Sequence, residues 1–405
     1  MKRFIILFLS NHFLSNKIFL KKNNLNFEEI VSFENNIHLN NKIFEQFHNI
    51  NSENKLIDGN INHKRSNNPD ITIIITIYNQ AHCLHRGLRS VQNQSLKNLE
   101  IIIIDDCSFD NSTDVVKEYQ KEDERIILIS HDMNEGEIKS RNDGIRIAKG
   151  KYITIIDGDD ALIHKDILKN SLYIAEKAEL DVVEFPAGIF INGKFKELVN
   201  NYNNINISYI IYQPELKTKF YYKRDNRYYI QNRVIWSKII RKELFINALD
   251  YLGDGVADDY INEAEDTLML LGIFHLAKSF YIMKEMGYYY SFGEKKKKFP
   301  QSTNRICKTN NKLKKMGWYK YLKFLVDKNS ATKKEKLITY NEFRLINNKK
   351  IFNLKLDNRH YQLMFYVWNK ILKFDNLSKK QKKYITRLKN KAIKRIKAEK
   401  HIMVK

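Results

Sequence analysis

The chain has 405 residues, 43% of them apolar and 12% aromatic, enough for one large or two ordinary domains with real cores. This composition excludes a disordered chain. The formal charge of +23 is confined to one end, because residues 305–405 carry +24 and the first 304 residues carry −1. Three widely spaced cysteines fit no disulfide framework and no metal-binding spacing.

The N-terminal segment has a basic start and an apolar run from Phe4 to Leu9. That run is much shorter than the roughly 20 apolar residues that cross a bilayer. Residues 1–20 are therefore either a weak signal or interfacial anchor, or a leader without targeting value. Residues 21–69 are polar and rich in asparagine, and we expect a loosely structured connection there.

Order begins at Asp70 with an alternation of buried strands and helices. Continuous β-branched or apolar runs predict strands, and apolar positions three or four residues apart predict helices. The predicted strands cover 71–78, 99–104, 125–129 and 152–156, and the predicted helices cover 80–94, 112–121 and 138–148. This order predicts a parallel sheet with right-handed crossovers.

Polar residues follow three of these strands. Tyr78 and Asn79 end the first, Asp105 and Asp106 end the second, and an acidic turn that starts at Asp157 ends the fourth. Ligands of open parallel sheets bind beyond the carboxyl ends of the strands. Three such ends at one edge therefore indicate a binding site.

The acidic turn contains Asp157, Asp159 and Asp160 within four residues. Their mutual repulsion is costly unless a cation compensates it. Carboxylates suit Mg²⁺ or Mn²⁺, which bridge to substrate phosphates and would neutralise a departing diphosphate. The alternative is a solvated acidic turn.

Asp105 and Asp106 are acceptors that suit a base N–H or ribose hydroxyls. Capping of a helix that begins near Asn111 is the alternative for this segment, and both roles are compatible.

The segment from Asp70 to Asp160 contains TIIITIYNQ, LEIIIIDDCS, SRNDGI and IIDGDD in this order. It resembles the family 2 glycosyltransferases of the GT-A fold. The resemblance implies an α/β fold in which helices flank a mostly parallel sheet. Residues 70–160 would form a Rossmann-like nucleotide-sugar half, 161–300 an acceptor half, and 301–405 a basic, mainly helical C-terminal region.

The resemblance also implies an inverting enzyme that transfers a single sugar from a nucleotide sugar, typically a UDP-sugar. The acceptor would be a hydroxyl of a glycan, a lipid-linked molecule or a protein. A divalent metal, Mn²⁺ or Mg²⁺, would be the cofactor. The absence of a Gly-rich loop after the first strand disfavours nucleotidyl transfer and dinucleotide-dependent oxidation. A degenerate domain that acts as a membrane or nucleic-acid scaffold is the remaining alternative.

Donor-side roles are carried over from the resemblance one position at a time. The implied nucleotide-sugar contacts are Thr76, Tyr78, Asn79, Asp105, Asp106, Arg141, Asn142 and Asp157. Asp157 and Asp159 match the metal-binding DXD pair, and Asp160 is a further ligand. The sequence departs from the family at Thr76 (often Pro), Cys107 (often Gly) and Phe109 (often Thr). Thr76 would still be able to hydrogen-bond a uracil, whereas Cys107 and Phe109 add bulk to a loop near the donor and bear on the base preference.

Glu265 and Asp266 begin an apolar helical stretch. Acids at that position complement a helix dipole, which is the structural alternative. Inversion needs a base for the acceptor hydroxyl, and the resemblance of AEDTLMLL to the acceptor half assigns Asp266 as this base and Glu265 as its orienting or acceptor-binding partner. It also places Trp236 and Lys238 on the acceptor side. A core position is an equal alternative for Trp236.

The basic C-terminal segment has three interpretations. It would dock on an anionic membrane surface, bind nucleic acid, or form a solvated helical appendage on the catalytic domain. No nucleic-acid motif supports the second. Taken together, these features predict a cytoplasmic or peripherally membrane-associated protein.

Overall fold

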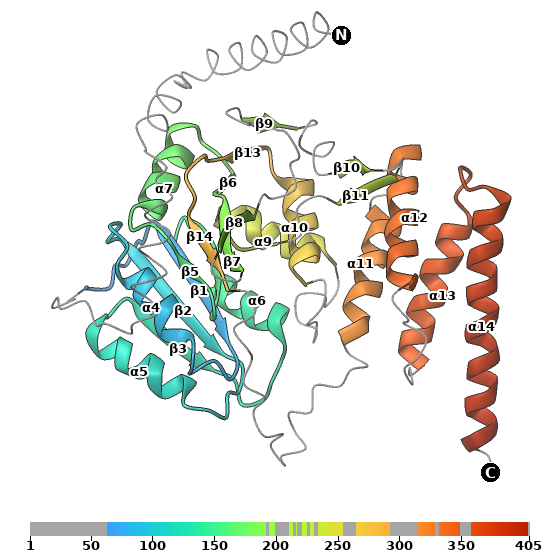
Figure 1. Cartoon of the computed structure of the whole chain (residues 1–405), viewed down its shortest axis with the longest axis horizontal. Helices are drawn as coiled ribbons and strands as arrows, with labels where there is room; N and C mark the ends of the chain where they lie inside the picture. Colours follow the sequence, from blue (N-terminus) through green and yellow to red (C-terminus); the bar gives the residue numbers. More distant parts are fainter. Residues whose placement is uncertain are drawn as a thin grey trace, which may run out of the picture.

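A computed structural model describes residues 63–191, 194–198, 210–213, 216, 221–224, 227–230, 234–253, 265–291, 314–328, 332–348 and 358–403. Its centre is a sheet of eight strands with helices on both faces (Figure 1). The strand order is β3 (Ile126–Ser130), β2 (Leu99–Asp105), β1 (Ile71–Ile77), β4 (Tyr152–Asp157), β12 (Lys238–Arg241), β6 (Val182–Glu184), β13 (Ser279–Ile282) and β9 (Ile211–Tyr212).

The first four strands of this order are parallel, as their sequence predicts. Beyond β4 the sheet becomes mixed, because β12 runs antiparallel to both of its neighbours. The expected α/β architecture, in which helices flank a mostly parallel sheet, is confirmed.

Helices cover the two faces of the sheet in sets. α4 (Leu84–Gln92), α5 (Ser112–Glu122) and α7 (Ile167–Lys177) pack on one face. α6 (Glu137–Ile147), α9 (Lys242–Tyr251) and α10 (Glu265–Leu276) pack on the other. Alternation along β1 explains the division, since Ile73 and Ile75 join the first set and Ile74 joins the second. The strand is buried on both faces because it carries β-branched residues on both.

A smaller sheet has the order β5 (Ala161–Leu162), β14 (Tyr288–Tyr290), β7 (Ala187–Ile191) and β8 (Lys194–Leu198). A separate hairpin joins β10 (Tyr221–Arg224) to β11 (Arg227–Ile230). The pairing of β14 with β5 places β14 directly beside the chain that leaves the acidic turn.

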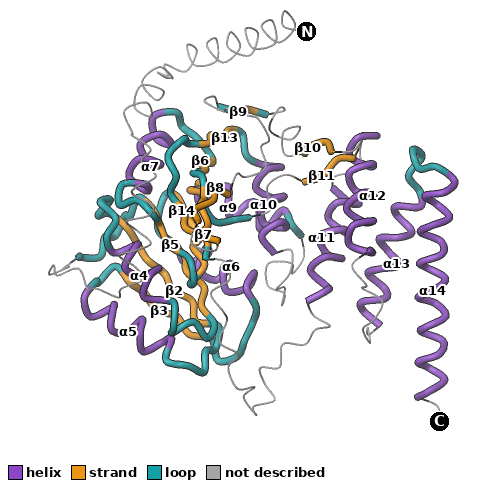
Figure 2. The backbone as a smooth tube through the Cα atoms, viewed as in Figure 1, coloured by secondary structure: helices purple, strands orange, loops and turns teal. Residues whose placement is uncertain are grey.

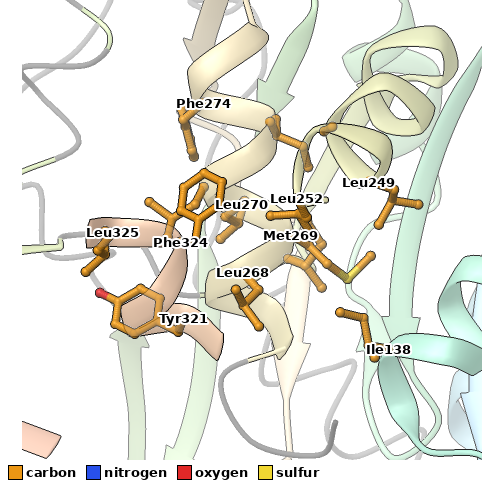
Figure 3. Packing of buried hydrophobic residues seen from close by; sticks show 14 of the residues in the cluster. Ile138, Leu249, Leu252, Leu268, Met269, Leu270, Phe274, Tyr321, Phe324 and Leu325 are labelled. Carbon is orange, nitrogen blue, oxygen red and sulfur yellow. The ribbon is translucent and has the colours of Figure 1, made fainter. Parts of the chain in front are cut away.

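The C-terminal region is helical, with α11 (Lys314–Lys328), α12 (Lys333–Asn348), α13 (Asn358–Leu372) and α14 (Lys379–Met403). Figure 2 shows these helices grouped at one end of the molecule. Figure 3 shows α10 packed between the two regions, with Leu268 and Phe274 near α11 and Met269 near α6 and α9. One hydrophobic cluster therefore extends from the sheet to α14. The predicted boundary at residue 300 lies outside the described residues and stays a prediction.

Within the described part of the chain, no helix is both long and apolar enough to cross a membrane. The proposed signal or anchor at residues 1–20 falls outside that part.

Candidate active site

The site lies where the direction of strand addition reverses. β2 and β3 are added on one side of β1, and β4 is added on the other side. In the register of the sheet, Thr76 lies beside Asp157 and Ile77 lies beside Asp105. The three polar strand ends named from the sequence therefore meet at one edge, at the kind of switch point where α/β sheets bind ligands.

Two loops at this edge hold strained residues. Asn79 has φ 54° and Cys107 has φ 67°, both in the left-handed region. The amide of Asn79 donates to Ser108 Oγ (2.9 Å), and its Oδ1 accepts from the amide of Phe109 (2.7 Å), so the loops after β1 and β2 brace each other. Glycine would adopt the Cys107 conformation without strain, which is a physical reason for the family's usual residue there.

Asp105 and Asp106, at the end of β2, have different hydrogen-bond partners. Asp105 is 2% exposed, accepts hydrogen bonds from the Ser108 amide, and has its pKa raised by burial. The carboxylate of Asp106 accepts hydrogen bonds from the amides of Glu135 (2.8 Å) and Gly136 (2.9 Å), and it contacts His131 Nδ1 at 3.0 Å. Asp106 therefore fixes the loop that leads into α6.

Arg141 is the centre of the site. Its guanidinium is 1% exposed and contacts Asp157 at 2.9 Å, Asp266 at 2.5 Å and Glu137 at 2.6 Å. Burial opposes its charge, yet the surrounding carboxylates raise the pKa of Arg141 well above its ordinary value. One side chain thus joins the end of β4, the first turn of α6 and the first turn of α10. The neighbouring Asn142 is fully buried in α6.

The three acids of the turn after β4 have different surroundings. Asp160 is fully buried, and its carboxylate accepts hydrogen bonds from the Tyr288 hydroxyl (2.7 Å) and the Ser291 amide (2.8 Å). Burial raises the pKa of Asp157 to about 7, against the opposing effect of Arg141. Among the described residues, the Asp159 side chain makes neither a hydrogen bond nor an ion pair. Asp159 is therefore the acid that a ligand would meet without displacing a protein contact.

No group of three or more His, Cys, Asp and Glu side chains in the described ranges is arranged to hold a metal. The donor set that fits one is Asp159 together with the Asp157 oxygen not engaged by Arg141, since Asp160 is committed to Tyr288 and Ser291. One or two carboxylates suffice for Mg²⁺ or Mn²⁺ when substrate phosphates and waters complete the coordination. The residues fit a metal that arrives with a diphosphate.

Glu265 and Asp266 lie in the first turn of α10. Asp266 is held from two sides, by Arg141 and by the amide of Ile235 at 3.3 Å. Glu265 Oε2 is buried without a hydrogen-bond partner among the described residues. Burial, with the nearby charges of Asp266 and Glu137, raises the pKa of Glu265 to about 8.

The raised pKa of Glu265 predicts a pH-dependent loss of stability. In the folded protein Glu265 keeps its proton up to about pH 8, whereas a glutamate in the unfolded chain has the ordinary pKa of 4.5. Between these two pH values the folded protein therefore binds more protons than the unfolded chain. The free energy of unfolding consequently falls as pH rises through this range. We expect Glu265→Gln to be more stable than the parent above pH 8 by on the order of 2 kcal/mol, and nearly equal to it near pH 5.

Urea unfolding across this pH range measures the effect. Glu243→Gln, at an exposed position in α9, is the control and should leave the pH dependence unchanged. A parallel loss of stability in Glu265→Gln and the parent would contradict the prediction.

Trp236 and Lys238 occupy interior positions. Trp236 is 5% exposed and stacks on Tyr288 and Tyr290, with ring centroids 4.6 and 5.4 Å away. Lys238 Nζ lies 3.2 Å from Glu184, and neither side chain has exposed surface. Lys238 therefore has no surface in this structure with which to reach an acceptor, while the partly buried Tyr290 of the aromatic stack does.

Sequence reasoning missed three residues of the site: Glu137, Tyr288 and His131. Glu137 precedes Arg141 by four residues, a spacing that indicates an ion pair on a helix, but it lies one residue before the predicted helix at 138–148. Tyr288 donates to Asp160 and accepts from the Asp157 amide (3.2 Å), and His131 contacts both Asp106 and Asp143. These last contacts join segments far apart in the sequence and carry no local signal.

The fold and the site define a class, an α/β domain with acidic residues at the carboxyl-end edge of its parallel strands. Residues 72–249 match the family model described as "Glycosyl transferase family 2". Residues 72–249 therefore form a family 2 glycosyltransferase domain.

Among the curated proteins, the chain is 27% identical over 226 residues to EpsJ of Bacillus subtilis, an uncharacterized glycosyltransferase (55% of this chain, 61% of EpsJ). It is 35% identical over 96 residues to GalNAc(5)-diNAcBac-PP-undecaprenol β-1,3-glucosyltransferase of Campylobacter jejuni (24% of this chain, 31% of that protein). The first three curated relatives match over only 40%, 61% and 30% of their own lengths.

Among solved structures, residues 1–349 of S. aureus TarS in complex with UDP-GlcNAc align with a TM-score of 0.51. The sequence identity is 16%, and the alignment covers 75% of this chain and 80% of that one. At this identity the likeness shows a shared fold.

Proposed function

We propose that this protein is an inverting glycosyltransferase that moves one sugar from a nucleotide sugar, of the UDP type, to an acceptor hydroxyl. The observation that carries the proposal is that Asp157 and Asp266 both form ion pairs with Arg141. A donor-side acid and the acid assigned as base would thereby lie close to the same substrate. A direct displacement requires this proximity.

The donor would lie at the edge of the sheet formed by the ends of β1, β2 and β4. Thr76, Tyr78 and Asn79 would line the base, and Asp105 would accept from the base or ribose. The UDP-GlcNAc complex of TarS, which shares the fold, supports a UDP-sugar. Asp157 and Asp159 would hold a divalent metal, which when bound supplies positive charge to the departing diphosphate.

Asp266 would accept the proton of the acceptor hydroxyl as the new bond forms. Its contacts with Arg141 and the Ile235 amide fix the carboxylate in position before substrate binds. Glu265 would orient Asp266 or bind the acceptor. One relative acts on an undecaprenyl diphosphate-linked glycan by its name, which supports a lipid-linked acceptor within the broader choice of glycan, lipid-linked molecule or protein.

Donor and metal binding are tested by thermal unfolding with a panel of nucleoside diphosphates and nucleotide sugars, each with and without Mn²⁺. Binding to the native state at about 100 times the Kd adds about 2.7 kcal/mol, which raises Tm by several degrees. We expect one nucleotide to act only with metal. Asp159→Ala should abolish the shift without lowering the Tm of the free protein, because its carboxylate makes no described contact.

Asp250→Ala, at an exposed position on α9, is the control and should keep the full shift. A folded protein that no nucleotide stabilises would overturn the proposal. That result would favour the other candidate, a degenerate domain that binds a membrane or nucleic acid through its basic C-terminal region.

A further inference from the structure

α14 presents a row of cations on one side. Lys380, Lys383, Arg387, Lys391 and Lys394 are all exposed and follow one another at intervals of three or four residues. This spacing places them on a single face of a helix. We call these five residues the cationic face.

The opposite side of α14 is fixed against the protein. Ile385 and Ala392 are fully buried, and Ile396 packs partly buried against the same core. Tyr384 and Leu388, along the edge of the cationic face, are also partly buried against it. α14 is the outermost helix in Figure 1, with α13 on its inner side. The cationic face therefore points away from the molecule in a fixed orientation.

Four of the five cations of this face have no acidic partner among the described residues. No Asp or Glu occurs between Asp375 and Glu399. Within the described residues, Lys380, Lys383, Arg387 and Lys394 form no ion pair. Elsewhere in the catalytic domain some cations are neutralised, since the half-buried Arg89 pairs with Glu122 and the exposed Lys151 pairs with Glu176.

Like charges at such spacing weaken a helix by a few tenths of a kcal/mol per pair. A polyanionic partner would offset this cost.

The shape of the cationic face favours an anionic membrane surface over a single strand of nucleic acid as its partner. From Lys380 to Lys394 it is a straight row about 21 Å long, at 1.5 Å per residue. The other exposed residues around the row include Thr386 and Asn390, and the one aromatic residue of α14, Tyr384, is partly buried against the core. Single-stranded nucleic acids are bound by aromatic platforms within basic grooves, whereas anionic lipid attracts each Lys and Arg without further contacts.

We propose that the cationic face of α14 docks this protein on the surface of an anionic lipid bilayer. The interaction is electrostatic, so it weakens as salt rises. Docking requires no donor or acceptor sugar and is independent of the proposed transfer reaction.

Cosedimentation of the full chain with vesicles tests the proposal, using phosphatidylcholine with and without phosphatidylglycerol at low and physiological salt. We expect binding to the anionic vesicles alone. The triple variant Lys383→Glu, Arg387→Glu, Lys394→Glu should bind them at least tenfold more weakly. Its Tm should match the parent, because the three side chains are exposed.

The matched control is Lys121→Glu, Lys169→Glu, Lys177→Glu, which changes net charge equally at exposed positions on α5 and α7. We expect it to retain most vesicle binding. Equal loss in both variants would overturn the proposal, since net charge and not this face would then decide binding. Tighter binding to a single-stranded oligonucleotide than to vesicles, at equal phosphate concentration, would overturn it in favour of nucleic acid.

Discussion

Arg141→Ala is expected to destabilise the protein by about 3 kcal/mol, because it leaves three partly or fully desolvated carboxylates without their shared cation. The lost contacts are those to Glu137, Asp157 and Asp266. The loss should be larger at pH 8 than at pH 5. Without Arg141 the pKa of Asp157, already raised to about 7 by burial, rises further, and protonation at low pH relieves the repulsion.

Urea unfolding at the two pH values measures this effect. Arg146→Ala is the control on the same helix, since Arg146 and Asp250 form a pair with side chains 46% and 60% exposed, and it should cost less than about 1 kcal/mol. Arg141→Lys should fall between the two, because an ammonium lacks the planar fork that contacts three carboxylates at once. If Arg141→Ala and Arg146→Ala lowered the free energy of unfolding equally, the prediction that Arg141 stabilises the site through three carboxylates would be wrong.

Asp266→Asn is expected to lower the rate of sugar transfer by a factor of about 100 or more, because the amide cannot accept the acceptor proton. Donor binding should persist, since Asp266 is not a proposed nucleotide contact and most of those contacts lie at the ends of β1, β2 and β4. The rate is measured as release of the nucleoside diphosphate from whichever donor stabilises the protein. The Tm shift with that donor shows separately whether the site still binds.

Asp250→Asn, an exposed position on α9, should leave the rate unchanged. Glu265→Gln distinguishes the two acids of α10. If it abolishes transfer while Asp266→Asn retains more than about a tenth of the rate, the base is Glu265, whose pKa of about 8 also suits proton transfer near neutral pH.

Local sequence patterns determined the fold of residues 70–160 almost completely. The runs of isoleucine around Ile73 and Ile102 lie in strands buried on both faces, as predicted. The predicted helices between these strands are present, with ends displaced by a few residues. The convergence of Tyr78, Asp105 and Asp157 at one edge was also predictable, because parallel strands with crossover helices must bring their carboxyl ends together.

The structure of residues 161–300 was harder to predict from the sequence. Its strands are two to five residues long, too short for a clear alternation, and β12 enters antiparallel between β4 and β6. Lys238 illustrates the consequence. The resemblance places it on the acceptor side, and no local pattern reveals that Glu184 pairs with it inside the sheet.

The sequence by itself thus determined the sheet, the edge that carries the site, and the acids that compose it. It also determined that the C-terminal positive charge is separate from that chemistry. Only the tertiary structure decided how those acids are shared. Arg141 contacts both Asp157, which is 16 residues away in the sequence, and Asp266, which is 125 residues away, while Asp160 accepts a hydrogen bond from Tyr288. The physical reason is that local propensity sets strands and helices, whereas the partner of a buried charge depends on which distant segments pack against it.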